Sequence, residues 1–112
     1  MTQLEALALS LAIEIPVVML IGMGWGPQLK RLGLVAACVT LLTHPFAWWG
    51  FHYLQESIPS FYVRASLIEG AVAGAESTLF AMLLSLPPRR ALALGVTANL
   101  VSFGVGLALS EI

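Results

Sequence analysis

The sequence predicts an all-α integral membrane protein, a four-helix bundle that forms one transmembrane domain over residues 1–112. Hydrophobic residues make up 59% of the chain and charged residues 10%, whereas soluble domains carry about 25% charged residues. The mean hydropathy is +0.92. The chain also divides into four apolar segments, each close to the roughly 20 residues that cross a bilayer. A surface so poor in charge favours lipid over water as its solvent.

Short turns rich in glycine, proline or basic residues separate these segments. The predicted helices are residues 4–23, 32–50, 63–86 and 91–110, and an interfacial loop is predicted at 51–62. Pro16 tends to kink the first helix, and Pro87 and Pro88 end the third. Aromatic residues in and just before the interfacial loop are typical of a membrane surface.

The basic residues predict one orientation in the membrane. Four spans bring Lys30, Arg31, Arg89 and Arg90 to one side and leave only Arg64 on the other. By the positive-inside rule, both short turns then face the cytoplasm and both termini lie outside.

The sequence also predicts the surroundings of four further residues. Arg64 is expected to reach water at the outer surface. Cys38 lies in an apolar run and is expected to be a small buried residue; a lone cysteine also excludes an internal disulfide. Gly70 and Gly74 form a GxxxG pair, which is expected to pack closely against another helix.

The third helix carries two acids where a membrane helix should carry none. Glu69 and Glu76 are seven residues apart, which is about two turns, so both lie on one face of the helix. An acid at a helix centre costs roughly 2.5–3.5 kcal/mol on insertion scales. Such acids need partners, protonation or a bound ion.

Counting 1.5 Å per residue from the predicted membrane surface gathers the polar residues at two depths. The layer near the midplane consists of Glu14, Thr40, Glu76 and Asn99. The layer nearer the outside consists of His44 and Glu69, with Thr43 close by. The cytoplasmic halves of all four helices are almost purely apolar, so the polar residues predict a site in the outer half of the membrane.

We therefore expect a small transporter or channel-like protein whose intramembrane site binds protons or cations. The expected ion-binding residues are Glu14, His44, Glu69 and Glu76, and the expected lining residues are Thr40, Thr43, Asn99 and Ser102. Buried carboxyls can exchange a proton for a cargo, and a histidine can relay protons near neutral pH.

Two alternatives stay open. Glu14, His44, Glu69 and Glu76 could instead bind a divalent metal ion or serve a pigment, although the Glu-x-x-His di-iron signature is absent. The chain could also be an accessory subunit of a larger membrane complex, or a homo-oligomer. No nucleophile motif surrounds the serines, so an enzyme is not expected, and the net charge of −1 argues against nucleic-acid binding.

Several short elements resemble a family of small, uncharacterised four-helix membrane proteins of bacteria. These elements are EIPV, THP in LLTHPFAWW, the E-x6-E pair of Glu69 and Glu76, and AN-xx-SF-xx-G in TANLVSFGVG. The resemblance covers most of the chain and implies the bacterial inner (plasma) membrane, but it implies no activity. In length and in the place of Glu14, the chain is also similar to small multidrug resistance transporters. The third-helix pattern of those transporters has no counterpart in GAVAGAESTLF, so this similarity is an analogy.

Overall fold

The structure is a computed structural model that describes residues 2–110, the side chain of Ser110 excepted. Within that range it consists of four helices and no strands: α1 (Gln3–Gly22), α2 (Leu29–Tyr53), α3 (Phe61–Leu83) and α4 (Pro88–Ser110). All four helices are long and apolar enough to cross a membrane. The predicted fold class, a four-helix membrane bundle, is confirmed.

The helix boundaries differ from the prediction by up to three residues. Helix α2 continues through Tyr53, so residues 51–53 of the predicted loop are helical and the connection is residues 54–60. Stacking of Trp49 on Tyr53, with ring centroids 4.7 Å apart, supports this extra turn. Helix α3 ends at Leu83 and Ser85 adopts a φ of 53°, which breaks the helical geometry. Helix α4 begins at Pro88, because a helix does not use the N–H of its first residue.

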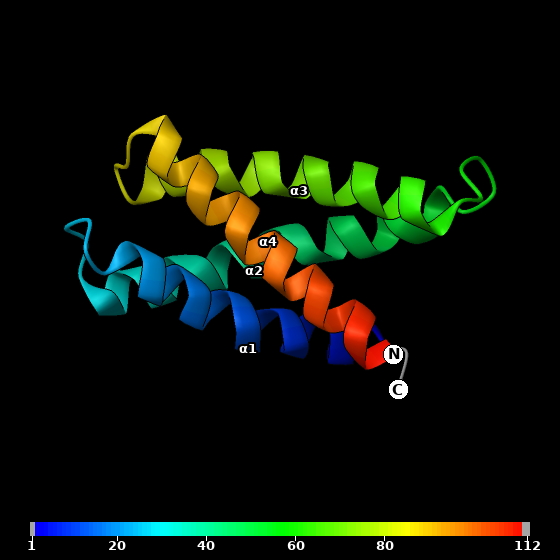
Figure 1. Cartoon of the computed structure of the whole chain (residues 1–112), viewed down its shortest axis with the longest axis horizontal. Coiled ribbons are helices and arrows are strands. Elements are labelled where there is room, and N and C mark those ends of the chain that lie inside the picture. Colours follow the sequence, from blue (N-terminus) through cyan, green and yellow to red (C-terminus); the bar gives the residue numbers. More distant parts are fainter. Residues whose placement is uncertain (1, 111–112) are drawn as a thin grey trace.

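The helices form a ring in which the backbone of each lies beside those of its two neighbours. In the described residues, α1 and α3 each pack against α2 and α4, while the backbones of the diagonal pairs, α1 with α3 and α2 with α4, stay apart. Figure 1 shows the termini and the α2–α3 connection at one end of the bundle, and the α1–α2 and α3–α4 turns at the other. We call these the terminal end and the turn end. The longest dimension is 43 Å, enough to cross about 30 Å of hydrocarbon.

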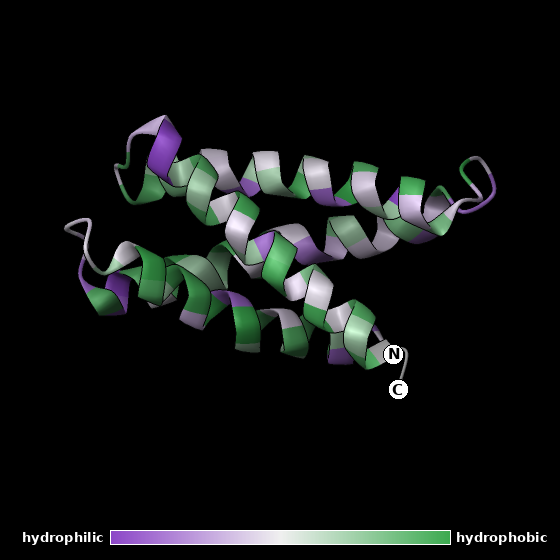
Figure 2. Ribbon diagram, in the orientation of Figure 1, coloured by the Kyte–Doolittle hydropathy of each residue, from purple (hydrophilic) through white to green (hydrophobic). Residues whose placement is uncertain are grey.

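The half of the bundle toward the turn end is filled by an apolar core. Its fully buried members include Val18 of α1, Leu32 of α2, Phe80 of α3 and Leu94 of α4. Each lies on the turn side of the polar residues of its own helix. Figure 2 shows strongly hydrophilic residues at both ends of the bundle and a few within the helices. The predicted contrast between a polar half and an apolar half is therefore present in the fold.

Helices α3 and α4 approach each other most closely at Gly95. A Cβ atom on Gly95 would lie 2.9 Å from the carbonyl oxygen of Ala73 and 3.0 Å from the backbone nitrogen of Ser77. The expectation for Gly70 and Gly74 is wrong within this chain, because nothing lies within 4 Å of a Cβ built at either residue. Both glycines line the open groove between α3 and α4 instead of a close helix contact.

Two other expectations are also wrong. Cys38 is exposed on the outer face of α2. Arg64 is buried, with only 5% of its surface exposed. Its Nη1 donates to the carbonyl oxygen of Ile58 at 2.8 Å, and its guanidinium carbon lies 4.2 Å from the centroid of the Phe51 ring. Carbonyls of the α2–α3 connection and an aromatic face thus replace water around this charge.

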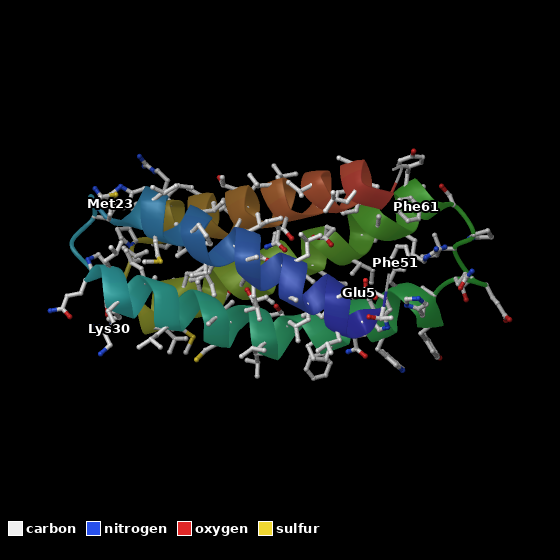
Figure 3. All side chains as sticks on the ribbon, turned by 90° about the horizontal axis from the view of Figure 1, so that it is seen from below. Glu5, Met23, Lys30, Phe51 and Phe61 are labelled. Carbon is white, nitrogen blue, oxygen red and sulfur yellow. The ribbon has the colours of Figure 1, made fainter. Side chains whose placement is uncertain are left out.

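Four basic residues lie at the turn end, in the first turns of α2 and α4: Lys30, Arg31, Arg89 and Arg90. Figure 3 shows Lys30 and Met23 at this end and Glu5, Phe51 and Phe61 at the other. Arg31 Nη2 donates to the carbonyl oxygen of Leu83 at 2.6 Å, which connects the start of α2 to the end of α3.

Candidate functional site: an intramembrane carboxyl chamber

All eight residues predicted for the site line one small chamber on the bundle axis. The chamber has a volume of about 40 Å³. Its lining consists of Ser10, Glu14, Thr40, Thr43, His44, Ala47, Glu69, Val72, Glu76, Asn99 and Ser102. Every helix contributes, and among these described residues there is no Lys or Arg. The two predicted layers therefore meet in a single chamber.

The ring arrangement of the helices explains this meeting. Since the backbones of the diagonal helix pairs stay apart, polar side chains on the inner faces can fill the space between them. On α3, Glu69, Val72 and Glu76 are spaced i, i+3, i+7 and share one face. Ser10, which sequence reasoning missed, is four residues before Glu14 and lies on the same face of α1. This spacing of four residues could have indicated that Ser10 lines the site together with Glu14.

Glu76 is the most buried acid, with 1% of its surface exposed, and both its oxygens have partners. Asn99 Nδ2 donates to Glu76 Oε1 at 2.6 Å and to the carbonyl oxygen of Gly95 at 2.7 Å. These two bonds use both protons of the amide nitrogen. The Thr43 hydroxyl lies 2.6 Å from Glu76 Oε2. Glu76 thus connects α3 to both α2 and α4.

Thr43 makes two close contacts but has only one proton to donate. Its Oγ1 is 3.0 Å from the carbonyl oxygen of Val39 as well as 2.6 Å from Glu76 Oε2. A hydroxyl has one donor and two acceptor positions. The hydroxyl either shares its proton between the two acceptors, or it donates to Val39 and accepts a proton from a neutral Glu76. The geometry therefore accommodates Glu76 with or without a proton.

Glu14 is buried but incompletely satisfied. Only 4% of its surface is exposed, and its Oε1 has no hydrogen-bond partner. It lies close enough to Glu76 and Glu69 for the charges of these groups to interact. An unpaired buried carboxyl oxygen is costly, so Glu14 has hydrogen-bonding capacity that the fold leaves unused.

His44 forms the border of the chamber toward the terminal end. Its Nε2 is buried and has no hydrogen-bond partner. The ring stacks on Trp48 with centroids 6.3 Å apart. Across the same border, Ser102 Oγ donates to Ser10 Oγ at 3.5 Å, a long contact between α4 and α1. The imidazole is thus a second group in this region with unused hydrogen-bonding capacity.

A larger cavity lies next to the chamber at the terminal end. Its volume is about 210 Å³, and it shares Ser10, His44, Ala47, Glu69 and Ser102 with the chamber. We call it the vestibule. A groove of about 440 Å³ between α3 and α4 also reaches two chamber residues, Glu69 and Asn99. Toward the turn end the apolar core follows the chamber directly.

The alternative of a metal centre built from Glu14, His44, Glu69 and Glu76 is not supported. Among the described residues, no group of three or more His, Cys, Asp or Glu side chains is arranged to hold a metal ion. Hydrogen bonds to Asn99 and Thr43 already engage Glu76. The four residues therefore line one chamber without forming a ligand set for a metal.

Comparison with protein-family models, with curated proteins and with solved structures finds no match. The family resemblance stays a prediction, and function must be argued from the chamber and its surroundings.

Proposed function

We propose that this protein is a small membrane carrier that binds protons or a small monovalent cation on Glu14, Glu69 and Glu76. The observation that carries the proposal is the chamber itself. Three carboxyls share a space of about 40 Å³ with one imidazole and no basic side chain among the lining residues. Burying three acids inside a membrane costs free energy, and intramembrane ionisable groups are usually functional.

The size of the chamber favours a small occupant. One water molecule occupies about 30 Å³ of the liquid, so a volume of about 40 Å³ suits one water molecule or one dehydrated cation. The unpaired Glu14 Oε1 and His44 Nε2 are available to such an occupant. Proton sharing between Glu76 and Thr43 offers the alternative state, in which the carboxyl is neutral.

Access supports a carrier more than an open channel. The vestibule lets the chamber be approached from the terminal end, while buried residues such as Leu32, Phe80 and Leu94 fill the other side. Transport would require the two hairpins to separate at this apolar core. With termini outside and a location in the bacterial inner membrane, loading would occur from the outer side.

The proposal is tested by flux in liposomes. Purified protein with an internal pH dye should show proton flux that depends on Na⁺ or K⁺ gradients. We expect Glu14→Gln and Glu76→Gln each to lower the rate at least tenfold, because each removes one protonation site.

Glu56→Gln is the matched control, since Glu56 is exposed in the α2–α3 connection. This variant should keep the flux of the unmodified protein. Unchanged flux in the double variant Glu14→Gln/Glu76→Gln would disprove the proposed carrier function.

A second candidate, an accessory subunit or a homo-oligomer, is favoured by Gly70 and Gly74. Both lie on an exposed face of α3 with open space beside them, and GxxxG faces commonly pair helices in membranes. Native mass spectrometry from mild detergent tests this candidate. A partner or a second copy that is lost in Gly70→Leu and Gly74→Leu would support it, whereas a lone chain in the unmodified protein would count against it.

A further inference from the structure

We propose that the vestibule binds a small protonated amine with an apolar body, which is the cargo that exchanges with protons in the chamber below. This inference rests on the proposed cation site and adds the substrate class. It is argued from four properties of the vestibule: its rings, its charge, its hydrogen-bond acceptors and its size.

Four large aromatic side chains form part of the vestibule wall. Trp48, Phe51, Phe61 and Phe103 all line it, and the remaining lining is mostly aliphatic. Figure 3 shows Phe51 and Phe61 together at the terminal end. An aromatic wall attracts ammonium groups through the negative faces of the rings and also binds hydrocarbon. It offers little to an inorganic ion that must keep its water shell.

The charge at the vestibule floor is negative. Glu69 lines both the vestibule and the chamber, and its charge interacts with that of Glu76. The nearby cation is Arg64, which is not among the lining residues. Its charge is engaged by the Ile58 carbonyl and by the Phe51 ring. An ammonium group at the floor therefore faces carboxyls, and the Phe51 contact shows that the same aromatic cluster already accommodates a cation.

The acceptors favour a cation that still carries an N–H group. His44 lines the vestibule, and its Nε2 is buried without a partner. In the neutral tautomer with the proton on Nδ1, Nε2 is an acceptor. Glu69 supplies carboxyl oxygens at the same floor. A quaternary ammonium has no N–H to donate, so it would leave Nε2 unsatisfied.

The cavity volume limits the ligand. At about 30 Å³ for each non-hydrogen atom, as in liquid water, about 210 Å³ holds roughly seven such atoms. Cyclohexylammonium has that size, and cyclohexanol is its neutral counterpart of the same shape. Comparing the affinities of these two compounds therefore separates the contribution of charge to binding from that of apolar burial.

The test uses Trp48 as a reporter in the full chain. Trp25 and Trp49 are replaced by phenylalanine, so that fluorescence reports only on the vestibule. Titration of detergent-solubilised protein with cyclohexylammonium should give a saturable change. We expect cyclohexanol and N,N,N-trimethylcyclohexylammonium to bind at least tenfold more weakly. Equal affinity for the alcohol and the amine would overturn the proposal.

Amine binding to single-residue variants tests whether the binding site is the vestibule. Glu69→Gln should weaken cyclohexylammonium binding at least tenfold, and His44→Phe should remove the preference over the trimethylated probe. Glu56→Gln, an exposed acid outside the cavity, should bind as the unmodified protein does. Circular dichroism checks that each variant is folded. Unchanged amine affinity in folded Glu69→Gln would overturn the assignment.

The two proposals can fail separately. Proton flux that Glu14→Gln abolishes, without saturable amine binding, leaves the carrier proposal in place and removes the amine. Amine binding without any proton flux retains the vestibule as a binding site and removes the transport function.

Discussion

At the residue scale, the state of the chamber depends on how many protons its three carboxyls share. Thr43 has close contacts to Glu76 and to the Val39 carbonyl, so its hydroxyl can accept a proton from Glu76 while donating to Val39. Like charges at short distance in low dielectric strongly disfavour full ionisation. We therefore expect at least one neutral carboxyl in the chamber at neutral pH.

Infrared spectroscopy checks this prediction. The carbonyl band of a protonated carboxyl should be present at pH 7 in membranes and absent, or reduced by about one carboxyl, in Glu76→Gln. Thr43→Val should shift the band, because it removes the hydrogen-bond partner while keeping the side-chain volume. Thr78→Val is the matched control, since the Thr78 hydroxyl bonds only the Gly74 carbonyl in the described contacts. A spectrum without a protonated-carboxyl band would contradict the prediction.

Sequence reasoning identified the ionisable residues of the site because burying them is expensive. Glu14, Glu69 and Glu76 stand out in apolar segments. The depth of Glu14 and Glu76 along their helices matches that of Asn99, and the depth of Glu69 matches that of His44. It did not identify the pairing of Asn99 with Glu76, because depth says nothing about rotation around the helix axis. The burial of Arg64 was missed for a similar reason. Its partners are carbonyls of the α2–α3 connection, whose path is not encoded in any local pattern.

At the element scale, the contact of α3 with α4 depends on Gly95. Its position leaves no room for a Cβ, since the nearest atoms are the Ser77 hydroxyl oxygen and backbone atoms of Ala73 and Ser77. Backbone atoms can give way only if the two helices move apart. Such a movement would also stretch the Asn99–Glu76 bond one turn away.

We expect Gly95→Ala to destabilise the protein by about 1–3 kcal/mol, the usual cost of overpacking. Gly104→Ala on the same helix is the matched control, because nothing lies within 4 Å of a Cβ built there. It should be neutral, or stabilising by up to about 1 kcal/mol through helix propensity. Reversible unfolding in mixed micelles measures both variants. Equal stability of the two would show that the close approach does not constrain the fold.

The helices were predictable as elements, but their faces were not. Length and hydropathy found all four spans, and they misplaced the end of α2 because its last turn is aromatic and amphipathic. The small residues of α3 and α4 look alike in sequence. Only the fold separates Gly95, where a Cβ would collide with α3, from Gly70 and Gly74, where a Cβ would meet open space. In a membrane both faces of a helix are apolar, so periodicity carries little information about which face is buried.

At the scale of the whole molecule, the bundle is asymmetric along its long axis. The terminal end has the vestibule and its aromatic wall, and the turn end has four basic residues beyond an apolar core. Figure 1 shows that both turns lie together at one end, so the four charges act on the same membrane surface. If the protein is the proposed carrier, its orientation in the membrane decides from which side the vestibule is loaded.

The orientation is the last prediction, and thiol labelling tests it. In a Cys38→Ala background, Ser57→Cys in the α2–α3 connection should react with a membrane-impermeant maleimide added to intact cells. Gln28→Cys in the α1–α2 turn should react only after the membrane is permeabilised. Both positions are exposed in the structure, so labelling reports on sidedness rather than on burial.

Changing the charged residues tests whether they determine the orientation of the protein in the membrane. Replacing Lys30, Arg31, Arg89 and Arg90 by glutamine should give mixed labelling, because it removes the basic residues that are expected to keep the turns on the cytoplasmic side. Glu5→Gln should leave the pattern unchanged, since acids contribute little to orientation. If Gln28→Cys reacts in intact cells while Ser57→Cys does not, the orientation is reversed, and the vestibule would then open to the cytoplasm.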